Sequence, residues 1–260
     1  MQLMAILNLT PDSFSDGGLF NTPEKAAERC DHFVRCGAHI IDVGAESTAP
    51  GSARVSAAEE MRRLDEVLPS VIASVPLPFS VDTYKAEVAA HALDLGAAYV
   101  NDVGGFALSD GMLELIVERR PYYICGHIFG DSLHEDGPGH SPDVIADALR
   151  RKADILTEKG FPPERLILDP GFGFGKNIAE NVALFKNIDV IRSLGFPVCC
   201  GVSRKRLIKH FSGGSPAELL GGSIAACILL AAKDIDIIRA HDVAETAAAL
   251  RLFDVLGKES

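Results

Sequence analysis

Polar side chains recur in this sequence directly after short apolar runs, at positions where they are able to bind a ligand. The clearest case is the segment 166–176, in which Leu-Ile-Leu is followed by Asp169 and then by Pro-Gly-Phe-Gly-Phe-Gly-Lys. An apolar run bounded by turn residues indicates a buried strand, and Pro170 and the glycines end it. A carboxylate where a buried strand opens into a loop is costly unless it is bound, although a lone aspartate there is equally well explained as a turn residue.

The other apolar runs end in the same way. They are followed by Asn8, by 10–13 (Thr-Pro-Asp-Ser), 44–48 (Gly-Ala-Glu-Ser-Thr), 82–83 (Asp-Thr), 101–102 (Asn-Asp), 203–206 (Ser-Arg-Lys-Arg) and 239–242 (Arg-Ala-His-Asp). Helix capping or turn formation explains any one of these residues. Polar residues at nearly every predicted strand end instead indicate that they converge on one site.

Some of these residues suit a flat, nitrogen-rich heterocycle. Asp82, Asn101 and Asp169 offer acceptors and an amide for a ring with several donors. Lys205 suits a ring carbonyl or a ring nitrogen. The residues therefore predict a heterocycle site inside the fold.

Others suit an anion at the rim of that site. Arg239, His241 and Asn8 are suited to an anion or a metal-bound phosphate, because arginine binds phosphate with two parallel hydrogen bonds. Glycine allows the backbone to approach a ligand closely. Three glycines near the predicted strand ends have this property: Gly171, Gly173 and Gly201.

Alternating apolar runs and amphipathic segments indicate the elements that position these residues. The apolar runs are 3–9, 39–43, 79–81, 99–100, 122–125, 166–168, 198–200 and 235–238. The amphipathic segments include 23–36, 57–73, 86–95 and 142–159, with prolines at two starts and glycines after three ends. Eight such units with near-continuous apolar strands predict an α/β fold, a single (β/α)8 TIM barrel that spans residues 1–260 as one domain. An open doubly wound sheet is the alternative, but no Gly-x-Gly-x-x-Gly turn follows the first run.

Three of the predicted loops are long. They are 10–22, 45–56 and 128–141. Because loops in α/β units are usually about 2–6 residues long, longer ones tend to carry function. In a TIM barrel the active site is built by the loops at the carboxyl ends of the strands.

Composition and charge exclude several classes of protein. The 260 residues are 47% hydrophobic and 23% charged, which is ordinary for a globular protein, and the net charge of −11 argues against nucleic acid as the main partner. The sequence lacks an apolar run long enough to span a membrane, and its amino terminus lacks the pattern of a signal peptide. The six cysteines form no CxxC pair and lie mostly in apolar segments, so buried reduced thiols and a cytoplasmic location are expected.

Seven segments resemble the ordered motifs of the dihydropteroate synthase family, a group of pterin-binding TIM barrels. They are 7–18 (Leu-Asn-Leu-Thr-Pro-Asp-Ser-Phe-Ser-Asp-Gly-Gly), 44–48, 80–83 (Ser-Val-Asp-Thr), 101–102, 169–176, 203–205 and 239–242. The resemblance covers essentially the whole chain. The first and fifth motifs are too long for a chance match.

This resemblance implies a transferase of folate biosynthesis. Such an enzyme joins 6-hydroxymethyl-7,8-dihydropterin diphosphate to p-aminobenzoate, giving 7,8-dihydropteroate and diphosphate. The resemblance also implies small-molecule substrates, Mg²⁺ as the cofactor with Asn8 as its ligand, and a homodimer.

The resemblance assigns roles to individual residues as well. The implied pterin-binding residues are Asp82, Asn101, Asp169, Gly201, Lys205 and Arg239. The implied diphosphate-binding residues are Asn8, Thr48, Arg239 and His241. The implied p-aminobenzoate-binding residues are Thr48, Phe174 and Ser203. Catalytic roles are implied for Asn8, Asp82, Lys205, Arg239 and His241.

The residue types fit that chemistry. Diphosphate leaves most easily when Mg²⁺ and cationic donors take up the developing charge. The electron-rich pterin stabilises the methylene cation that is left behind, so a dissociative route needs no protein nucleophile. The first two loops are expected to close over this cation and exclude water.

The sequence departs from the family pattern at three places. Ala49 stands where the family usually has an arginine in the second loop, and Arg54 is either its substitute or a solvated loop residue. The fifth run leads into His-Ile-Phe-Gly at 127–130 instead of His-Met-x-Gly, which retains an apolar wall of altered shape. The sequence begins almost directly on the first run, so less cover is expected at the amino-terminal end of the barrel.

Other functions remain as alternatives. A pterin-dependent methyltransferase of the related group fits the barrel, although the loop 10–18 belongs to the synthase pattern, and a Schiff-base lyase would use Lys205. A non-catalytic paralogue that binds pterin is the third alternative, supported only by Ala49. His127, His134 and His140 lack the tight spacing of a zinc site.

Overall fold

The computed structural model describes residues 1–10, 22–46, 54–129 and 140–257. Several residues of the sequence predictions lie outside these ranges: Asp12, Ser13, Ser47, Thr48, Ala49 and His134.

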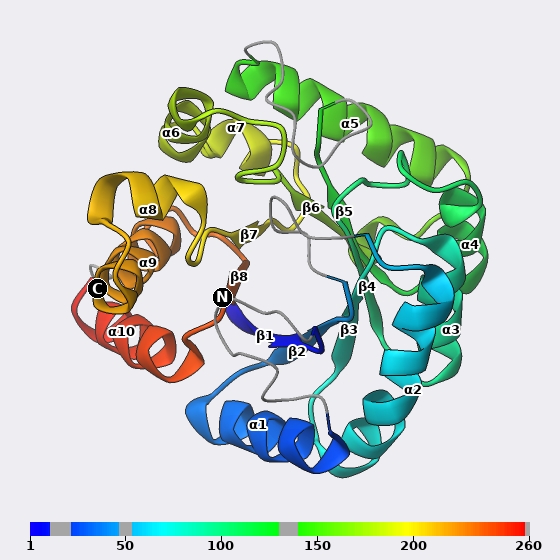
Figure 1. The fold of residues 1–260 in the computed structure, drawn as a ribbon. Helices are drawn as coiled ribbons and strands as arrows, with labels where there is room; N and C mark the ends of the chain where they lie inside the picture. The colour runs from blue at the N-terminus through cyan, green and yellow to red at the C-terminus, as the bar shows by residue number, and fades with distance from the viewer. Residues whose placement is uncertain (11–21, 47–53, 130–139, 258–260) are drawn as a thin grey trace.

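Eight parallel strands form one sheet that is rolled into a barrel (Figure 1). They are β1 (Gln2–Asn8), β2 (Ile40–Gly44), β3 (Phe79–Asp82), β4 (Tyr99–Asp102), β5 (Tyr122–Gly126), β6 (Leu166–Asp169), β7 (Cys199–Gly201) and β8 (Ile237–Ala240). Their hydrogen-bonded order is β6-β5-β4-β3-β2-β1-β8-β7. The predicted TIM barrel is confirmed, and the doubly wound alternative is wrong.

Ten α-helices in the described ranges surround the strands (Figure 1). They are α1 (Pro23–Cys36), α2 (Ala57–Ser74), α3 (Ala86–Asp94), α4 (Met112–Arg119), α5 (Pro142–Glu158), α6 (Ile178–Lys186), α7 (Asp189–Arg192), α8 (Arg206–Ser212), α9 (Pro216–Ala231) and α10 (Val243–Leu256). A short 3-10 helix, η1 (Pro163–Arg165), precedes β6.

Local sequence explains where the predicted helices begin and end. At the start of α1 the Thr22 hydroxyl accepts a hydrogen bond from the backbone N–H of Lys25. Pro23 occupies the first turn, where a backbone N–H has no partner within the helix. Gly37 ends α1 in the left-handed region with φ of 93°. Ser141 caps α5 in the same way as Thr22 caps α1.

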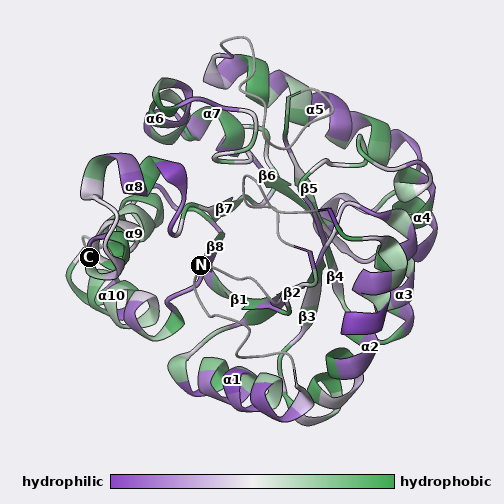
Figure 2. Cartoon of the chain, in the orientation of Figure 1, coloured by the Kyte–Doolittle hydropathy of each residue, from purple (hydrophilic) through white to green (hydrophobic). Residues whose placement is uncertain are grey.

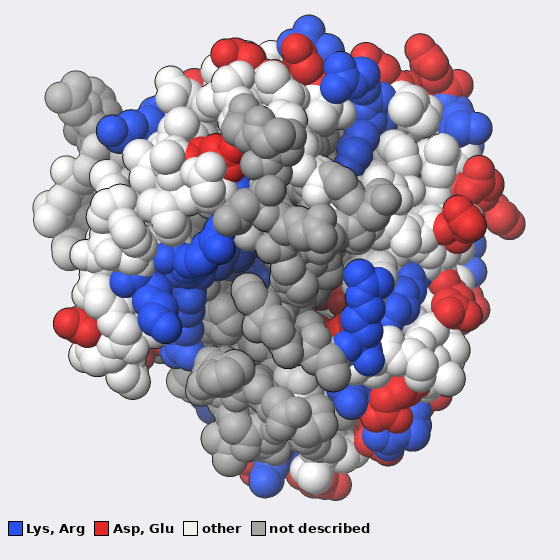
Figure 3. Space-filling model, turned by 45° about the horizontal axis from the view of Figure 1, so that its top comes forward, with Lys and Arg blue, Asp and Glu red and all other residues white. Residues whose placement is uncertain are grey.

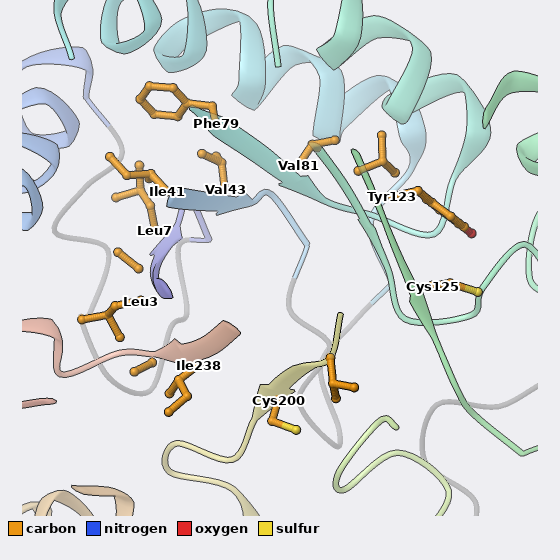
Figure 4. Close-up of a cluster of buried hydrophobic side chains, with 14 of the residues drawn as sticks. Leu3, Leu7, Ile41, Val43, Phe79, Val81, Tyr123, Cys125, Cys200 and Ile238 are labelled. Carbon is orange, nitrogen blue, oxygen red and sulfur yellow. The ribbon is translucent and has the colours of Figure 1, made fainter. Parts of the chain in front are cut away.

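Alternate side chains of each strand face outward and pack against the helices. The hydrophobic core between the strands and the helices combines these strand residues with buried helix residues such as Phe33, Leu64 and Leu149. Figure 4 shows outward-facing side chains from β1, β2, β3, β5, β7 and β8, and Figure 2 shows that the helices carry both hydrophobic and hydrophilic residues. The two-residue period of a strand thus separates the barrel interior from the shell.

The inward-facing side chains change character along the barrel. At its amino-terminal end they form a separate apolar cluster: Met4, Ile40, Tyr99, Ile124, Ile167, Cys199 and Ile237. Tyr99 also stacks on Tyr122, with ring centres 4.7 Å apart. The next inward positions on several of these strands are polar: Asp42, Asn101, Asp169 and Arg239. The barrel interior is therefore filled by apolar side chains at its amino-terminal end and lined by polar side chains at its carboxyl end.

Strands β6 and β7 make the least regular contact in the barrel. Seven strand pairs form ladders of several residues, whereas these two are joined by the single bridge between Leu168 and Val198. One backbone bond, from the N–H of Leu168 to the carbonyl of Pro197 at 2.8 Å, accompanies it. We call this place the β6/β7 seam.

Within the described ranges, no individual helix has both the length and the hydropathy that a membrane span requires. Helices α8 and α9 reach them only when counted together, and they are bent by 111° relative to each other.

Candidate active site

The register of the sheet aligns four predicted positions in one row. Asn8 on β1 is opposite Gly44 on β2, Gly44 is opposite Asp82 on β3, and Asp82 is opposite Asn101 on β4. All four lie at the carboxyl ends of their strands. Residues that are up to about a third of the chain apart in sequence therefore reach one end of the barrel.

Arg239 is the centre of a buried ion-pair cluster in this row. Its Nε lies 2.6 Å from Asp42 Oδ2, and its Nη2 lies 2.5 Å from Asp82 Oδ2. The side-chain amide of Asn101 also donates to Asp42 Oδ2, at 3.0 Å. A buried charge needs such partners, so the cluster fixes the guanidinium in place.

Asp42 belongs to this cluster, although it was not predicted from the sequence as a site residue. Its side chain is fully buried, and its Oδ1 has no hydrogen-bond partner among the described residues. That oxygen can accept a hydrogen bond from a donor-rich ligand. The signal in the sequence was a carboxylate inside the apolar run 39–43, which is costly there unless it is paired.

Burial and opposite charge act against each other in this cluster. Burial raises the pKa of Asp82 to about 6, and the guanidinium of Arg239 opposes that rise. Burial lowers the pKa of Arg239, but the carboxylates of Asp42 and Asp82 raise it by more. The guanidinium therefore stays charged, while Asp82 gains a proton in mildly acidic solution.

Asp169 and Lys205 face the same interior from the two sides of the β6/β7 seam. Asp169 Oδ1 accepts the N–H of Gly171 at 2.7 Å, and Lys205 Nζ donates to the carbonyl of Phe172 at 2.5 Å. Burial raises the pKa of Asp169, and the charge of Lys205 opposes this. Burial lowers the pKa of Lys205 to about 8, and Asp169 opposes this. Lys205 Nζ also lies 4.3 Å from the centre of the Phe174 ring.

His241 and Ser203 tie the loop after β7 to the loop after β8. The His241 ring Nδ1 lies 3.2 Å from Ser203 Oγ, and the Arg204 guanidinium forms two hydrogen bonds with Asp242, one of them 3.0 Å long. Burial, and then the charge of Arg239, lowers the pKa of His241 to about 3. At neutral pH this side chain is therefore an uncharged hydrogen-bonding group.

Two glycines leave room beside the polar row. A Cβ atom on Gly44 would lie 3.5 Å from Asn8 Oδ1 and 3.8 Å from Asp82 Oδ2. A Cβ atom on Gly201 would lie 3.7 Å from two side-chain carbons of Arg239. Gly44 and Gly201 thus keep the ends of β2 and β7 clear of side chains where the polar groups gather.

The loop after β6 depends on glycine at one close approach. Gly171 has φ of 68°, and a Cβ atom there would lie 2.0 Å from the carbonyl oxygen of His127. The side chain of Lys176, at the end of this loop, is fully buried and donates to the carbonyl groups of His127, Gly171 and Phe174 at 3.1, 2.8 and 3.0 Å. Lys176 lies in the sequence motif 169–176, and no role was predicted for its side chain.

An apolar wall stands beside the polar groups. Tyr84, Val103 and Ile128 form a small buried cluster, with Leu108 and Phe174 packed against it. Ile128 therefore retains the apolar surface expected after β5.

The histidines near β5 have packing roles. His127 is 2% exposed, and burial lowers its pKa to about 2. Its ring is nearly perpendicular to that of Phe129, with centres 4.4 Å apart, and the His140 ring stacks on Phe129 with centres 3.4 Å apart. Among the residues that the structure describes, no group of three or more His, Cys, Asp or Glu side chains is arranged to hold a metal ion.

Hydrogen bonds and ion pairs around Lys85 join Glu46 and Val55, which lie on either side of the undescribed part of the predicted second loop. Lys85 Nζ donates to Glu46 Oε2 at 2.8 Å, to Glu60 and to the carbonyl of Val55. Glu46 Oε1 in turn accepts the N–H of Val55 at 3.1 Å. Burial raises the pKa of Glu60 to about 7, opposed by Lys85. This cluster was not predicted from the sequence. Arg54, next to Val55 in the chain, is exposed.

Asp102 is a strand-end residue that lies away from the site. Its carboxylate accepts the N–H groups of Gly104 and Phe106 and the hydroxyl of Tyr123, at 2.8, 2.6 and 2.7 Å. It stabilises the turn after β4, as a lone strand-end aspartate usually does.

The described site residues gather acceptors, one guanidinium and one ammonium on the interior face, with an apolar wall at their side. Such a set can orient a flat heterocycle by hydrogen bonds and stabilise negative charge that develops on a leaving group. Figure 3 shows Lys and Arg side chains gathered in two groups on the face that it presents. An acidic protein thus presents local positive charge around this end of the barrel.

Comparison with protein families gives a match over nearly the whole chain. Residues 4–241 match a family described as pterin binding enzyme. The chain is 37% identical over 258 residues to the dihydropteroate synthase of Synechocystis sp., an alignment that covers 98% of this chain and 89% of that protein.

Solved structures give the same result. A dihydropteroate synthase from Clostridium difficile, determined in the presence of pteroic acid, has a TM-score of 0.91 and 36% identity, covering 99% of this chain and 97% of the other. A dihydropteroate synthase from Xanthomonas albilineans with 4-aminobenzoic acid has a TM-score of 0.90 and 37% identity, covering 100% and 94%.

The close approach at Gly171 yields a stability prediction. We expect Gly171→Ala to cost about 2–4 kcal/mol of unfolding free energy, because it adds a steric clash to an unfavourable left-handed backbone. Urea denaturation measures this loss.

Gly160→Ala is the matched control. Gly160 also has a positive φ, 84°, but a Cβ atom there meets nothing within 4 Å. We expect this control to cost about 1 kcal/mol, from backbone conformation alone. Equal losses in the two variants would contradict the packing described for Gly171.

Proposed function

The chain belongs to the dihydropteroate synthase family of pterin-binding enzymes, and we propose that the carboxyl end of its barrel joins 6-hydroxymethyl-7,8-dihydropterin diphosphate to p-aminobenzoate. It is a transferase of folate biosynthesis, with 7,8-dihydropteroate and diphosphate as products. The observation that carries this proposal is the cluster of Arg239 with Asp42, Asp82 and Asn101, in a chain similar to these synthases over its whole length.

The interior polar groups hold the pterin in this proposal. Asp82, Asn101 and Asp169 provide hydrogen-bonding groups for the amino and ring N–H groups of pterin, and Lys205 donates to its ring oxygen or nitrogen. Asp42 Oδ1 is a further acceptor that the buried cluster keeps available. The ring stacks on the guanidinium of Arg239, and Gly201 leaves the space beside Arg239 clear.

The rim groups hold the diphosphate. Arg239, His241, Asn8 and Thr48 are the residues that we assign to it; Thr48 lies outside the described residues. His241, neutral at neutral pH, donates one hydrogen bond rather than a full charge. Arg54 is exposed at the end of the second loop and is the candidate to replace the arginine that the family has at the position of Ala49.

Mg²⁺ fits the oxygen atoms at the end of β1. Asn8 Oδ1 and Asp82 Oδ2 flank Gly44, and Mg²⁺ is usually held by one or two protein oxygens together with water and substrate phosphates. We assign Asn8 as the protein ligand. When bound, Mg²⁺ neutralises charge on the leaving diphosphate.

The chain's own residues then act by position and charge. Arg239 lies within hydrogen-bonding distance of Asp42 and Asp82, so its charge is held in place before the substrate arrives. As the bond to diphosphate breaks, Arg239 and His241 stabilise the leaving oxygens, and the pterin carries the resulting methylene cation. The amine of p-aminobenzoate, held between Phe174, Ser203 and Thr48, attacks that carbon, and the proton that it then loses passes to the released diphosphate or to water. No protein nucleophile takes part.

We further propose a cytoplasmic homodimer with small-molecule substrates and no nucleic-acid or membrane partner. All six cysteines are free, which suits a reducing compartment, and the net charge is −11. The dimer is supported by apolar side chains that are exposed on the last helices: Phe211, Leu229, Leu252, Val255 and Leu256. Helices α9 and α10, which carry four of them, lie next to each other (Figure 1).

The activity is tested by diphosphate release. We expect release from 6-hydroxymethyl-7,8-dihydropterin diphosphate to need Mg²⁺ and to be accelerated by p-aminobenzoate, with 7,8-dihydropteroate formed in equal amount. Tight pterin binding without release would show a non-catalytic paralogue instead. Release that p-aminobenzoate leaves unchanged would exclude the synthase reaction.

The pH dependence follows from Asp82 and Lys205. Asp82 has to be ionised to pair with Arg239, and its pKa is raised to about 6; Lys205 has to be protonated, and its pKa is lowered to about 8. The kcat/KM for the pterin diphosphate is therefore expected to fall below about pH 6 and above about pH 8. Lys205→Arg should move the upper limb beyond about pH 10, because arginine stays protonated there. Lys209→Met, at an exposed position of α8, is the control and should leave both limbs in place.

The dimer is tested by light scattering coupled to gel filtration. We expect the mass of a dimer for the unmodified chain and of a monomer for Leu252→Glu, because the added charge is costly to bury in an interface. Val144→Glu is the matched control, because Val144 is an exposed apolar residue on α5, and this variant should remain dimeric. A monomer before any substitution would refute the proposal.

A further inference from the structure

Lys176 is a buried cation that the proposed reaction leaves without a role. Its side chain has 0% exposure, and its ammonium donates three hydrogen bonds, all to main-chain carbonyl groups. A buried charge is retained at a cost, so a lysine in this place needs a reason. We propose that Lys176 is a positioning residue, which fixes the loop after β6 so that Phe174 is correctly placed for the second substrate, p-aminobenzoate.

The three bonds join two strands and close the loop on itself. The His127 carbonyl belongs to the segment after β5, and the Gly171 and Phe174 carbonyls belong to the loop after β6. Gly171 packs directly against His127 in the same place. The ammonium therefore holds the start and the end of the glycine-rich loop against the end of β5.

The main chain of Lys176 extends this link across the β6/β7 seam. Its carbonyl accepts a hydrogen bond from Arg206 Nη2 at 2.9 Å and one from Asn181 Nδ2, also at 2.9 Å. Asn181 Oδ1 accepts the N–H of Gly173 at 2.7 Å. One residue thus connects the ends of β5, β6 and β7, at the place where the strand ladder is reduced to a single bridge.

The positioned loop carries two groups that act on Lys205. The Phe172 carbonyl accepts the hydrogen bond of Lys205 Nζ, and the Phe174 ring lies 4.3 Å from the same nitrogen. In the proposed function Phe174 lines the p-aminobenzoate side, so this inference rests on that proposal. Three of the proposed pterin contacts, Asp82, Asn101 and Arg239, lie on strands with which Lys176 forms no hydrogen bond in the described structure, whereas Asp169 and Lys205 each bond the backbone of the loop after β6.

The proposed role of Lys176 requires its side chain to be protonated. The ammonium has three hydrogens for three carbonyl oxygens, whereas the neutral amine has only two, so deprotonation leaves one carbonyl without its donor. Burial lowers the pKa of Lys176 to about 7. The negative charges of Asp169 on β6 and, more weakly, Glu180 on α6 act to raise this pKa. The positive charges of Lys205 after β7 and, more weakly, Lys152 on α5 act to lower it further. His127 on the β5 side stays neutral, since its own pKa is lowered to about 2.

Steady-state kinetics with both substrates varied tests the proposal. For Lys176→Met we expect the KM for p-aminobenzoate to rise about tenfold, because a small displacement of a substrate-positioning group is enough for that loss. The KM for the pterin diphosphate should change less, because only Asp169 and Lys205 among its proposed side-chain contacts bond this loop. A purely structural role would lower kcat through loss of folded enzyme and would leave both KM values unchanged. Lys186→Met, at an exposed position of α6, is the matched control and should behave like the unmodified enzyme.

The pH dependence of the same KM tests the proposal without any loss of folding. In the unmodified enzyme the KM for p-aminobenzoate should rise as the pH passes upward through about 7, as Lys176 loses its proton. Lys176→Arg keeps a permanent charge with several donors, so its KM should be independent of pH between about 6 and 8. A flat profile in the unmodified enzyme would overturn the inference, even if Lys176→Met failed to fold.

Hydrogen exchange separates this inference from the proposed function. In Lys176→Met we expect the amides of 171–175 to lose protection, while those of α2 remain as in the unmodified chain. Unchanged protection of 171–175 would overturn the inference whatever the activity. If the unmodified enzyme released no diphosphate, the proposed function would fail, and the exchange result would still decide whether Lys176 holds the loop.

Discussion

The arrangement of this barrel depends on one cation held between carboxylates in its interior. Arg239 contacts Asp42 and Asp82 at 2.6 and 2.5 Å, and neither carboxylate would be stable as a buried ion without it. The same requirement keeps Arg239 from turning toward solvent. Because the opposite end of the interior is filled by apolar side chains such as Met4 and Ile167, ligands can reach this charged layer from the carboxyl end only. The position and charge of the site thus follow from a single group of ion pairs, and the direction of access follows from the apolar cluster at the other end of the barrel.

Much of the fold follows from local sequence signals. Apolar runs alternating with amphipathic segments predicted the barrel, and Pro23, Gly37 and Pro142 marked helix boundaries that the structure confirms. The convergence of Asn8, Asp82, Asn101 and Arg239 also followed, because parallel strands bring their carboxyl ends to one side. These inferences needed only residue type and order along the chain.

What the sequence did not reveal is which side chains meet across the barrel. The pairing of Asp42 with Arg239 joins residues 197 positions apart, and it depends on sheet register and on strand curvature. The Lys85 cluster and the three bonds of Lys176 depend in the same way on contacts between loops. Asp102 shows the reverse case, because its residue type suited a site but its contacts are those of a turn. Residue type indicates what a side chain can do, whereas register and loop packing decide which partner it has.

The reduced strand contact between β6 and β7 has a thermodynamic consequence. Asp169 and Lys205 stand on either side of that contact, and a single bridge joins the strands between them. A heterocycle bonded to both side chains spans the gap and adds a connection that the backbone lacks. Since the ligand then binds only the closed ring, occupancy lowers the population of open forms of the barrel, by an amount set by ligand concentration relative to its dissociation constant. In the proposed function, a bound pterin would therefore connect β6 to β7 and stabilise the closed barrel.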